Sequence, residues 1–311
     1  MLSNGVIMPE SIKLIYIAGP GRCGSTLLAR LLGEVDGFFN VGEALKWFFD
    51  TKNMGPERPC ACGSPVFECQ FWRKVSLFIK DSQEQKFATN FVRIRNLPIL
   101  ISPYKPSRLR RQWERLLASA QKLFFNIQGE THARCIVDSS KNAASAFVAS
   151  QIPGVELYLV HLVRDARGMV SSWIRPKGDL ESYPAYKPIF WWLSYNLSTE
   201  WIRPWAKDYL FIRYEDFVES PEKYIARILD MIGENTSAVE LFDRNAHLHL
   251  HHMVAGNPDR QTIGKVEIKL RPWKLPWYYN LATTVFTFPL LVKYGYIWPN
   301  RHGLKKAETP E

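Results

Sequence analysis

Residues 15–28 read Ile15-Tyr-Ile-Ala-Gly-Pro-Gly-Arg-Cys-Gly-Ser-Thr-Leu-Leu28. An apolar run typical of a buried strand ends in a loop that holds Gly19, Gly21 and Gly24, and an apolar helical pattern follows at once. In such a loop, glycines let backbone N–H groups turn toward one point, and the N-terminus of the helix adds positive potential there. The sequence therefore predicts a P-loop-like anion site.

This loop departs from the Walker pattern of ATP- and GTP-binding proteins. The spacing from Gly19 to Gly24 matches that pattern, but Ser25 stands where the Walker motif requires lysine. Arg22 supplies a cation from inside the loop instead. We expect the loop to hold a phosphate in a ligand other than ordinary ATP or GTP.

The composition is that of a globular protein with a basic surface. The chain has 311 residues, 46% of them hydrophobic, and a net charge of +10, with a pI near 9.3. This charge suits a polyanionic ligand, nucleic acid or an anionic membrane surface. Its five cysteines are odd in number and fit a reducing compartment better than a disulfide framework.

The chain shows neither a signal peptide nor a transmembrane pattern. Residues 1–13 lack a basic segment followed by an apolar one. The longest apolar stretch, Leu281 to Val292, is too short to span a bilayer and contains Pro289. We expect a cytoplasmic protein.

Strand-like runs recur along the chain, and each is followed by a helical pattern. The predicted strands are Ile12–Ala18, Phe38–Val41, Arg134–Val137, Glu156–Val163 and Tyr209–Tyr214. Their continuous apolar runs are typical of strands buried on both faces of a parallel sheet. We therefore predict a three-layer α/β sandwich with a central parallel sheet. Ligands of such sheets bind at the carboxyl ends of the strands, where Glu43, residues 138–141 and residues 164–167 gather.

A helical and loop-like insertion interrupts the α/β pattern at about residues 44–131. Its second half predicts an amphipathic helix over Ser107–Phe125 with Ser107 as N-cap. The basic residues of this region form either a solvated face or an electropositive lip over the anion site. We expect one α/β domain over residues 1–275, then a C-terminal aromatic helical segment and tail over residues 276–311, disordered from Leu304 to Glu311.

A second motif reads His161-Leu-Val-Arg-Asp-Ala-Arg-Gly-Met-Val-Ser-Ser-Trp173. A buried strand ends at Val163 and delivers Arg164 to its carboxyl end, and Ser172 follows eight residues later. An arginine and a serine placed in this way can bind one phosphate through a bidentate charged contact and a hydroxyl. The alternative is a structural ion pair of Arg164 with Asp165, or of Arg167 with Glu181.

At these two motifs the chain resembles the sulfotransferases that use 3′-phosphoadenosine 5′-phosphosulfate (PAPS). Residues 19–26 resemble their 5′-phosphosulfate loop, in the arginine-containing version of tyrosylprotein and carbohydrate sulfotransferases, and residues 164–172 resemble their 3′-phosphate motif. Residues 211–222 are similar to a late strand–helix unit of the family. Residues 256–273 are similar to its loop that closes on the nucleotide. The resemblance covers about residues 12–275 and is weakest in the insertion.

The resemblance implies transfer of a sulfonate group from PAPS to a hydroxyl, less readily to an amine, leaving adenosine 3′,5′-bisphosphate (PAP). It implies that Glu43 is the general base, that Lys141 steadies the bridging oxygen, and that Arg22 neutralises charge during transfer. The implied donor-binding residues are Gly21, Arg22, Cys23, Gly24, Ser25, Thr26, Arg164, Ser172 and Arg260. Alternatively, Glu43 caps a helix or pairs with an arginine, and Lys141 is a surface lysine.

Two other functions fit parts of the pattern. A P-loop kinase would place Asp138 on Mg²⁺, and a non-enzymatic polyanion-binding protein would explain the charge alone. For the sulfotransferase we expect no catalytic metal and no nucleic-acid partner. The acceptor is a carbohydrate, a tyrosine, a lipid or a small phenol, and the sequence does not choose among them.

Four further patterns have more than one interpretation. Cys60, Cys62 and Cys69 are one ligand short of a zinc site and have an unusual C-x-C spacing, so we expect plain thiols, with zinc or a disulfide as alternatives. Cys23 in the loop is a small residue or a thiol of lowered pKa. The histidines at 247, 249, 251 and 252 line a pocket rather than bind a metal. The aromatic segment 273–298 packs on the core or acts as a lid rather than touching a membrane.

Overall fold

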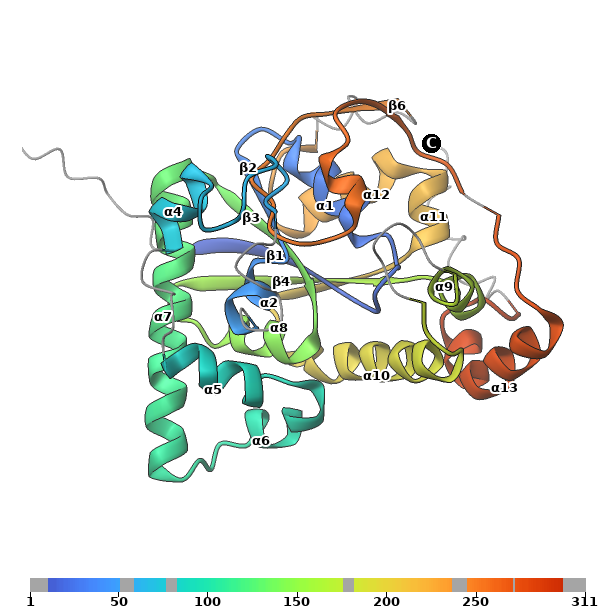
Figure 1. Cartoon of the computed structure of the whole chain (residues 1–311), viewed down its shortest axis with the longest axis horizontal. Coiled ribbons are helices and arrows are strands. Elements are labelled where there is room, and N and C mark those ends of the chain that lie inside the picture. The colour runs from blue at the N-terminus through green and yellow to red at the C-terminus, as the bar shows by residue number, and fades with distance from the viewer. Residues whose placement is uncertain are drawn as a thin grey trace, which may run out of the picture.

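A sheet of five parallel strands runs through the centre of the computed structural model (Figure 1), which describes residues 11–50, 59–76, 83–175, 182–236, 245–270 and 272–298. The strands are β1 (Ile12–Ala18), β2 (Phe38–Gly42), β3 (Cys135–Lys141), β4 (Val155–Val163) and β5 (Asp208–Arg213). Their order is β2-β3-β1-β4-β5. All five predicted strands are confirmed. β3 runs four residues further than expected, to Lys141, so residues 138–141 belong to the strand itself.

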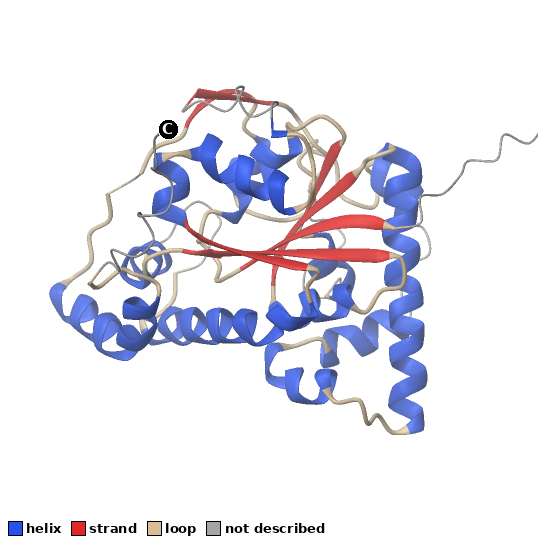
Figure 2. Cartoon of the chain, turned by 180° about the vertical axis from the view of Figure 1, so that it is seen from behind, coloured by secondary structure: helices blue, strands red, loops and turns tan. Residues whose placement is uncertain are grey.

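Helices cover both faces of this sheet, as the views from the front and from behind show (Figures 1 and 2). Side chains alternate along a strand, and β1 is buried on both sides. Leu14 and Tyr16 enter the core formed with α2 (Ala44–Phe49) and α8 (Ala143–Ser150). Ile15 and Ile17 enter the core formed with α1 (Ser25–Gly33) and α12 (Pro221–Met231). The predicted three-layer α/β sandwich is confirmed.

The insertion is mostly helical in its described part and joins the main core. It contains α4 (Gln70–Ser76), α5 (Gln83–Phe91), the short helix η1 (Ile94–Asn96), α6 (Leu97–Ile101) and α7 (Ser107–Thr131). α7 crosses the amino-terminal ends of the strands (Figure 1), and its Gln121 Nε2 donates to the carbonyl of Pro153 at 2.9 Å. Its buried face includes Trp113 and Leu116, which belong to the same core as α2 and α8.

The start of α7 differs from the prediction. Pro106, not Ser107, is the N-cap, because its extended backbone (ψ 148°) precedes the first helical residue and its carbonyl accepts the amide of Arg110 at 2.9 Å. Ser107 is already the first residue of the helix. The helix also continues six residues past Phe125, to Thr131.

The second half of the chain completes the two outer layers. It contains α9 (Ala166–Trp173), α10 (Tyr186–Ile202), the short helix η2 (Arg203–Trp205), α11 (Tyr214–Glu219), β6 (Asn245–Leu248), the short helix η4 (Pro258–Gln261), β7 (Gly264–Glu267) and α13 (Trp277–Lys293). β6 and β7 form a separate antiparallel pair. The expected disordered tail lies outside the described residues.

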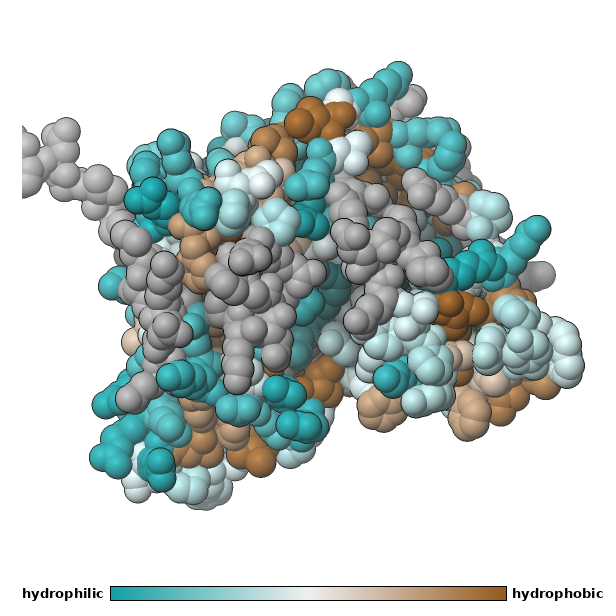
Figure 3. Space-filling view, viewed as in Figure 1, coloured by the Kyte–Doolittle hydropathy of each residue, from teal (hydrophilic) through white to brown (hydrophobic). Residues whose placement is uncertain are grey.

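The C-terminal helix α13 is only half buried. Leu290 and Leu291 pack in a small core with α9 and α10, as expected for this segment. Its other face exposes 77% of Trp277 and 67% of Phe286. In the space-filling view, brown and pale residues gather at the lower right, where α10 and α13 lie (Figure 3). Among the described helices, none has the length and hydrophobicity that crossing a membrane requires.

If α7 is part of the main core, shortening a buried side chain in it will destabilise the whole domain. Leu116 is fully buried, and we expect Leu116→Ala to lower the free energy of unfolding by about 2–5 kcal/mol. Arg115→Ala, one residue away on the exposed face, is the control and should change it by at most about 0.5 kcal/mol. Urea unfolding followed by circular dichroism measures both. Equal effects of the two variants would show that α7 does not share the core.

Candidate active site

The carboxyl ends of all five strands meet at one cavity of about 950 Å³. Each strand end, or the loop or helix that follows it, supplies part of the wall: Arg22 after β1, Glu43 after β2, Lys141 at the end of β3, Arg164 after β4 and Tyr214 after β5. Residues from the insertion and from residues 256–273 close the sides. This is where ligands bind in parallel α/β sheets.

The glycine loop has the predicted shape. Gly24 is the N-cap of α1 and adopts a left-handed backbone with φ of 96°. A Cβ on Gly24 would lie 2.3 Å from the Tyr214 ring, so only glycine fits here. The loop residues Gly21, Arg22, Gly24, Ser25 and Thr26 line the cavity. The amino end of α1 therefore opens into it.

The two predicted phosphate motifs lie in direct contact. Arg164 Nη1 donates to the carbonyl of Arg22 at 3.1 Å. The Arg22 guanidinium lies over the Trp173 ring at 4.9 Å, and the Arg164 guanidinium lies over the Tyr214 ring at 5.0 Å. Ser172 lines the same cavity. The two motifs therefore present two arginines and a serine to one space.

The ion pair considered as an alternative for the second motif forms elsewhere. Arg167, not Arg164, pairs with Asp165, with Nη2 and Oδ2 at 2.6 Å. Asp165 is also the N-cap of α9 and accepts the amide of Arg167. Glu181 lies outside the described residues. Arg167 thus stabilises the start of α9, which leaves Arg164 at the cavity.

Lys141 reaches the cavity because the end of β3 is irregular. The register of β3 against β1 shifts between Tyr16 and Ala18, and its register against β2 shifts between Asn40 and Gly42. Lys141 itself has a φ of 68°, an unfavourable backbone for a residue with a side chain. Bulges of this kind re-aim side chains near active sites.

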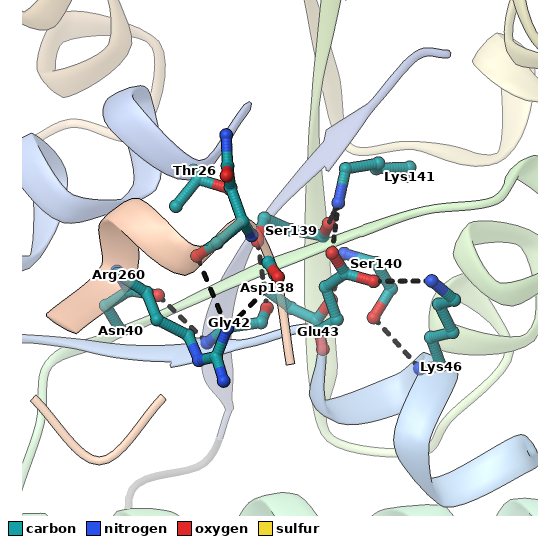
Figure 4. A network of polar contacts seen from close by, with 12 residues as sticks. Thr26, Asn40, Gly42, Glu43, Lys46, Asp138, Ser139, Ser140, Lys141 and Arg260 are labelled. Carbon is teal, nitrogen blue, oxygen red and sulfur yellow. Dashed lines mark hydrogen bonds and ion pairs between the residues drawn. The ribbon is translucent and has the colours of Figure 1, made fainter. Parts of the chain in front are cut away.

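Glu43 lies between two ammonium groups (Figure 4). Its Oε1 accepts a hydrogen bond from Lys141, and its Oε2 lies 2.7 Å from Lys46 Nζ. The carboxylate is buried, with 4% of the side chain exposed. Burial by itself raises the pKa of Glu43, but Lys141 and Lys46 outweigh it and lower the pKa to about 2. Glu43 is therefore ionised at neutral pH and faces the cavity.

Asp138 has a structural position. Its Oδ2 accepts the amide of Leu45 at 2.9 Å and its Oδ1 accepts the amide of Ser140 at 2.7 Å, so it holds the start of α2. Burial raises its pKa to about 6. Unlike Ser140 and Lys141, it does not line the cavity.

Two residues implied to bind the donor turn away from the cavity wall. The Cys23 side chain is buried in the core under the loop, and this burial raises the pKa of its thiol, opposite to the lowered value considered from the sequence. Only its backbone can serve a ligand. Arg260 directs its guanidinium to the carbonyls of Gly256, Asn257 and Pro59 at 3.3–3.4 Å. A contact of Arg260 with the donor stays a prediction.

The structure adds cavity residues that the sequence did not single out. They include Lys46, Trp173, Trp191, Tyr195 and Tyr214. Of these residues, Lys46 is the one that the sequence could have linked to the site. It lies three residues after Glu43, and residues with this spacing are neighbours on a helix. None of the four histidines at 247, 249, 251 and 252 lines this cavity: His249 and His251 bind Glu34 at 2.5 and 3.1 Å, and His252 joins the three cysteines.

The comparisons with known proteins bear on the family and the fold of this chain. A family model described as a sulfotransferase family matches residues 15–238. Because this match covers most of the chain, the chain belongs to the sulfotransferase family. A search of curated proteins found no significant match.

A solved sulfotransferase structure shares the fold. A sulfotransferase domain from the curacin biosynthetic pathway superposes with a TM-score of 0.54 at 15% identity, covering 90% of this chain and 97% of that domain. The sulfotransferase domain of the Synechococcus PCC 7002 olefin synthase gives 0.46 at 17% identity, covering 89% and 95%. A sulfotransferase from Alicyclobacillus acidocaldarius gives 0.42 at 11% identity, covering 91% and 94%.

The low pKa of Glu43 predicts how the stability of the protein depends on pH. The folded pKa of about 2 lies below the ordinary 4.5, so this carboxylate stabilises the fold above pH 4.5 and loses that effect as the pH falls toward 2. The difference in unfolding free energy between wild type and Glu43→Gln should therefore shrink over this range by on the order of 3 kcal/mol.

Denaturant unfolding at a series of pH values measures this difference. The exposed Glu114, paired with Arg110, provides the control, and Glu114→Gln should change the free energy of unfolding by at most about 0.5 kcal/mol. A difference for Glu43→Gln that stays constant with pH would contradict the ion pair with the two lysines.

Proposed function

We propose that this sulfotransferase moves a sulfonate group from PAPS to a hydroxyl acceptor, with Glu43 as general base. The observation that supports this most is the single cavity shared by the Arg22 loop, the Arg164–Ser172 pair and the Lys141–Glu43 pair. One nucleotide with a phosphate on each side of its ribose can contact both arginine motifs, because Arg164 touches the Arg22 loop.

The donor binds through its two anionic ends. Arg22 and the amides at the start of α1 hold the 5′-phosphosulfate, and Arg164 and Ser172 hold the 3′-phosphate. Arginine and backbone amides bind phosphate oxygens through charge-assisted hydrogen bonds. Because the site supplies its own cations, binding does not depend on Mg²⁺.

In the proposed reaction Glu43 accepts a proton and Lys141 neutralises negative charge. PAPS supplies an activated sulfonate. Glu43 accepts the proton of the acceptor hydroxyl, the acceptor oxygen bonds to sulfur, and the bond from sulfur to the bridging oxygen breaks. Lys141 and Arg22 neutralise the charge that develops on the leaving PAP.

Donor binding also makes Glu43 a better base. Without donor, Lys141 pairs with Glu43 and keeps the pKa of that carboxyl near 2. A bound phosphosulfate competes for the Lys141 ammonium. As Lys141 shifts to the donor, the pKa of Glu43 rises and the carboxylate becomes more basic. The base is thus activated when the donor is in place.

A kinase mechanism has little geometric support. Its Mg²⁺ ligand would be Asp138, but both carboxylate oxygens of Asp138 accept backbone amides behind the cavity wall. The Walker lysine is replaced by Ser25.

The acceptor side of the cavity includes Phe49, Ala88 and Val92 from α2 and the insertion, which suits an acceptor with an apolar part.

Nucleotide binding tests the two-phosphate arrangement. We expect PAP to bind without metal and more tightly than ADP with Mg²⁺. Ser172→Ala removes one hydroxyl from the proposed 3′-phosphate contact and should weaken PAP by about 10- to 100-fold, since a hydrogen bond to a charged group is worth about 1.5–3 kcal/mol.

AMP, which lacks the 3′-phosphate, provides the matched ligand for this variant. Isothermal titration calorimetry should show AMP affinity unchanged by Ser172→Ala. An equal loss for PAP and AMP would remove Ser172 from the 3′-phosphate site. A preference of the wild type for ADP with Mg²⁺ would favour the kinase, and binding of neither nucleotide would favour a polyanion-binding protein.

Turnover tests the general base. Glu43→Gln keeps the shape of the side chain but removes the proton acceptor, so sulfonate transfer should fall by about 10²- to 10⁴-fold while PAP affinity changes little. Glu267→Gln is the control, because Glu267 is an exposed carboxylate that lines the same cavity. Mass spectrometry of small-molecule mixtures incubated with PAPS would detect products that gain SO₃. Unchanged transfer by Glu43→Gln would exclude Glu43 as the base.

A further inference from the structure

Three cysteines of the insertion and one histidine from the C-terminal part of the chain meet at a single point outside the cavity. The thiols of Cys60, Cys62 and Cys69 and a ring nitrogen of His252 all lie within 4.8 Å of one another. Cys69 and His252 are 183 residues apart in the sequence. None of the four lines the candidate active site.

Three distances within this cluster are close to those between ligands of one tetrahedral metal ion. Cys62 Sγ and Cys69 Sγ are 3.7 Å apart, and His252 Nδ1 lies 3.2 Å from Cys69 Sγ and 3.9 Å from Cys60 Sγ. A tetrahedral zinc with bonds of about 2.3 Å to sulfur and about 2.0 Å to nitrogen separates its ligand atoms by about 3.4–3.8 Å. The sulfur atoms are too far apart for the bonded pair of a disulfide, which needs about 2.05 Å.

The surrounding structure holds each ligand in place. The C-x-C segment forms a tight turn in which Gly63 N donates to the Cys60 carbonyl at 2.9 Å. Cys69 directly precedes α4, and its carbonyl accepts the amide of Arg73. The His252 ring stacks on Phe71 of α4, with centroids 5.4 Å apart, and the His252 carbonyl accepts a hydrogen bond from Trp72 Nε1. Metal sites need such support to orient their ligands.

We propose that Cys60, Cys62, Cys69 and His252 bind one structural zinc ion. Four protein ligands complete a tetrahedral sphere and leave no open position for a substrate, as in structural Cys₃His sites. Thiolate and imidazole donors together favour zinc over the hard cations Mg²⁺ and Ca²⁺. The sequence shows only three closely spaced ligands, and the fold supplies the fourth.

The zinc ion fastens the insertion to a segment that contacts the general base. Ala61 N donates to the Met253 carbonyl at 2.9 Å on one side of this segment. On the other side, Val254 N donates to the Val41 carbonyl at 3.1 Å and Glu43 N donates to the Val254 carbonyl at 2.8 Å. A Cβ on Gly42 would lie 2.5 Å from that same carbonyl, so the two segments are closely packed. Zinc therefore positions the backbone of Glu43 from outside the active site.

Metal analysis of the purified full-length protein tests this proposal directly. We expect about one zinc per chain by inductively coupled plasma mass spectrometry. Cys69→Ser and His252→Gln should each lower the zinc content at least about tenfold under dilute chelator. Cys135→Ser and His249→Gln should retain it, because Cys135 lies in β3 and His249 binds Glu34.

The wild-type protein alone gives a second test in case the ligand variants fail to fold. Replacing zinc by Co²⁺ should give thiolate-to-cobalt charge-transfer bands and the intense visible bands of tetrahedral cobalt. Removing the metal with a strong chelator should lower the melting temperature and speed hydrogen exchange at the amides of Glu43 and Val254. Exchange at core amides of β4 should change least.

Three results would overturn the proposal. The first is metal-free protein in which all five thiols react with a thiol reagent after unfolding. The second is a disulfide between Cys62 and Cys69 in protein prepared under reducing conditions. The third is zinc that remains in both ligand variants, which would place it elsewhere. None of these readouts uses sulfonate transfer, so they do not depend on the proposed function.

Discussion

The buried carboxylate of Glu43 requires its two lysine partners, and this requirement shapes the ends of β2 and β3. An ionised group that is 96% shielded from water is stable only when opposite charges and hydrogen bonds compensate for lost hydration, and Lys46 and Lys141 provide them. Lys46 lies on α2 and Lys141 on β3. The same end of β3 also holds the start of α2, because Asp138 and Ser140 accept the amides of Leu45 and Lys46. The carboxylate, its lysines and the helix that carries one of them therefore form one electrostatic unit.

Unfavourable backbone conformations place the two key cations of the cavity. Arg22 and Lys141 both have φ of 68°, and a residue with a side chain in this region costs about 1–3 kcal/mol unless its neighbours fix it. The neighbours do so here: Gly19 N donates to the Lys141 carbonyl, and Trp173 Nε1 donates to the Gly21 carbonyl. The first bond joins the loop after β1 to the end of β3, and the second joins the same loop to the end of α9. Arg22 and Lys141 therefore have their strained backbone where the proposed chemistry needs positive charge, and regular strands and helices surround them.

The sequence predicted the sheet and the two arginine motifs because their signals are local. Continuous apolar runs define the strands, and a glycine loop between a strand and a helix defines the anion site. Contacts between residues that lie far apart in the sequence could not be predicted from it. The side chain of Asp138 binds a helix 93 residues away in the sequence, and the direction of the Arg260 side chain depends on the carbonyl of Pro59. Residue spacing identifies candidate metal ligands only when they lie in one segment of the sequence. For this reason His252 was assigned to a histidine-lined pocket rather than to the cysteines. The cap of α7 was misplaced by one residue, since an extended proline and a following serine are both compatible with a helix start.

Residues 252–257 connect features that lie far apart in the sequence. His252 belongs to the cysteine cluster, Val254 bonds to the backbone of Val41 and Glu43, and Asn257 N donates to Thr26 Oγ1 in the anion loop at 3.4 Å. Six consecutive residues thus touch the insertion, the carboxylate-bearing loop and the start of α1. A segment of this length without regular secondary structure has few hydrogen bonds of its own, so its conformation depends on what anchors its ends. One end is anchored by the cluster around His252, and the other lies against the anion loop. The hydrogen bonds of Val254 to the backbone of Val41 and Glu43 lie between these two ends, so the segment connects the fold of the insertion to the backbone of the site.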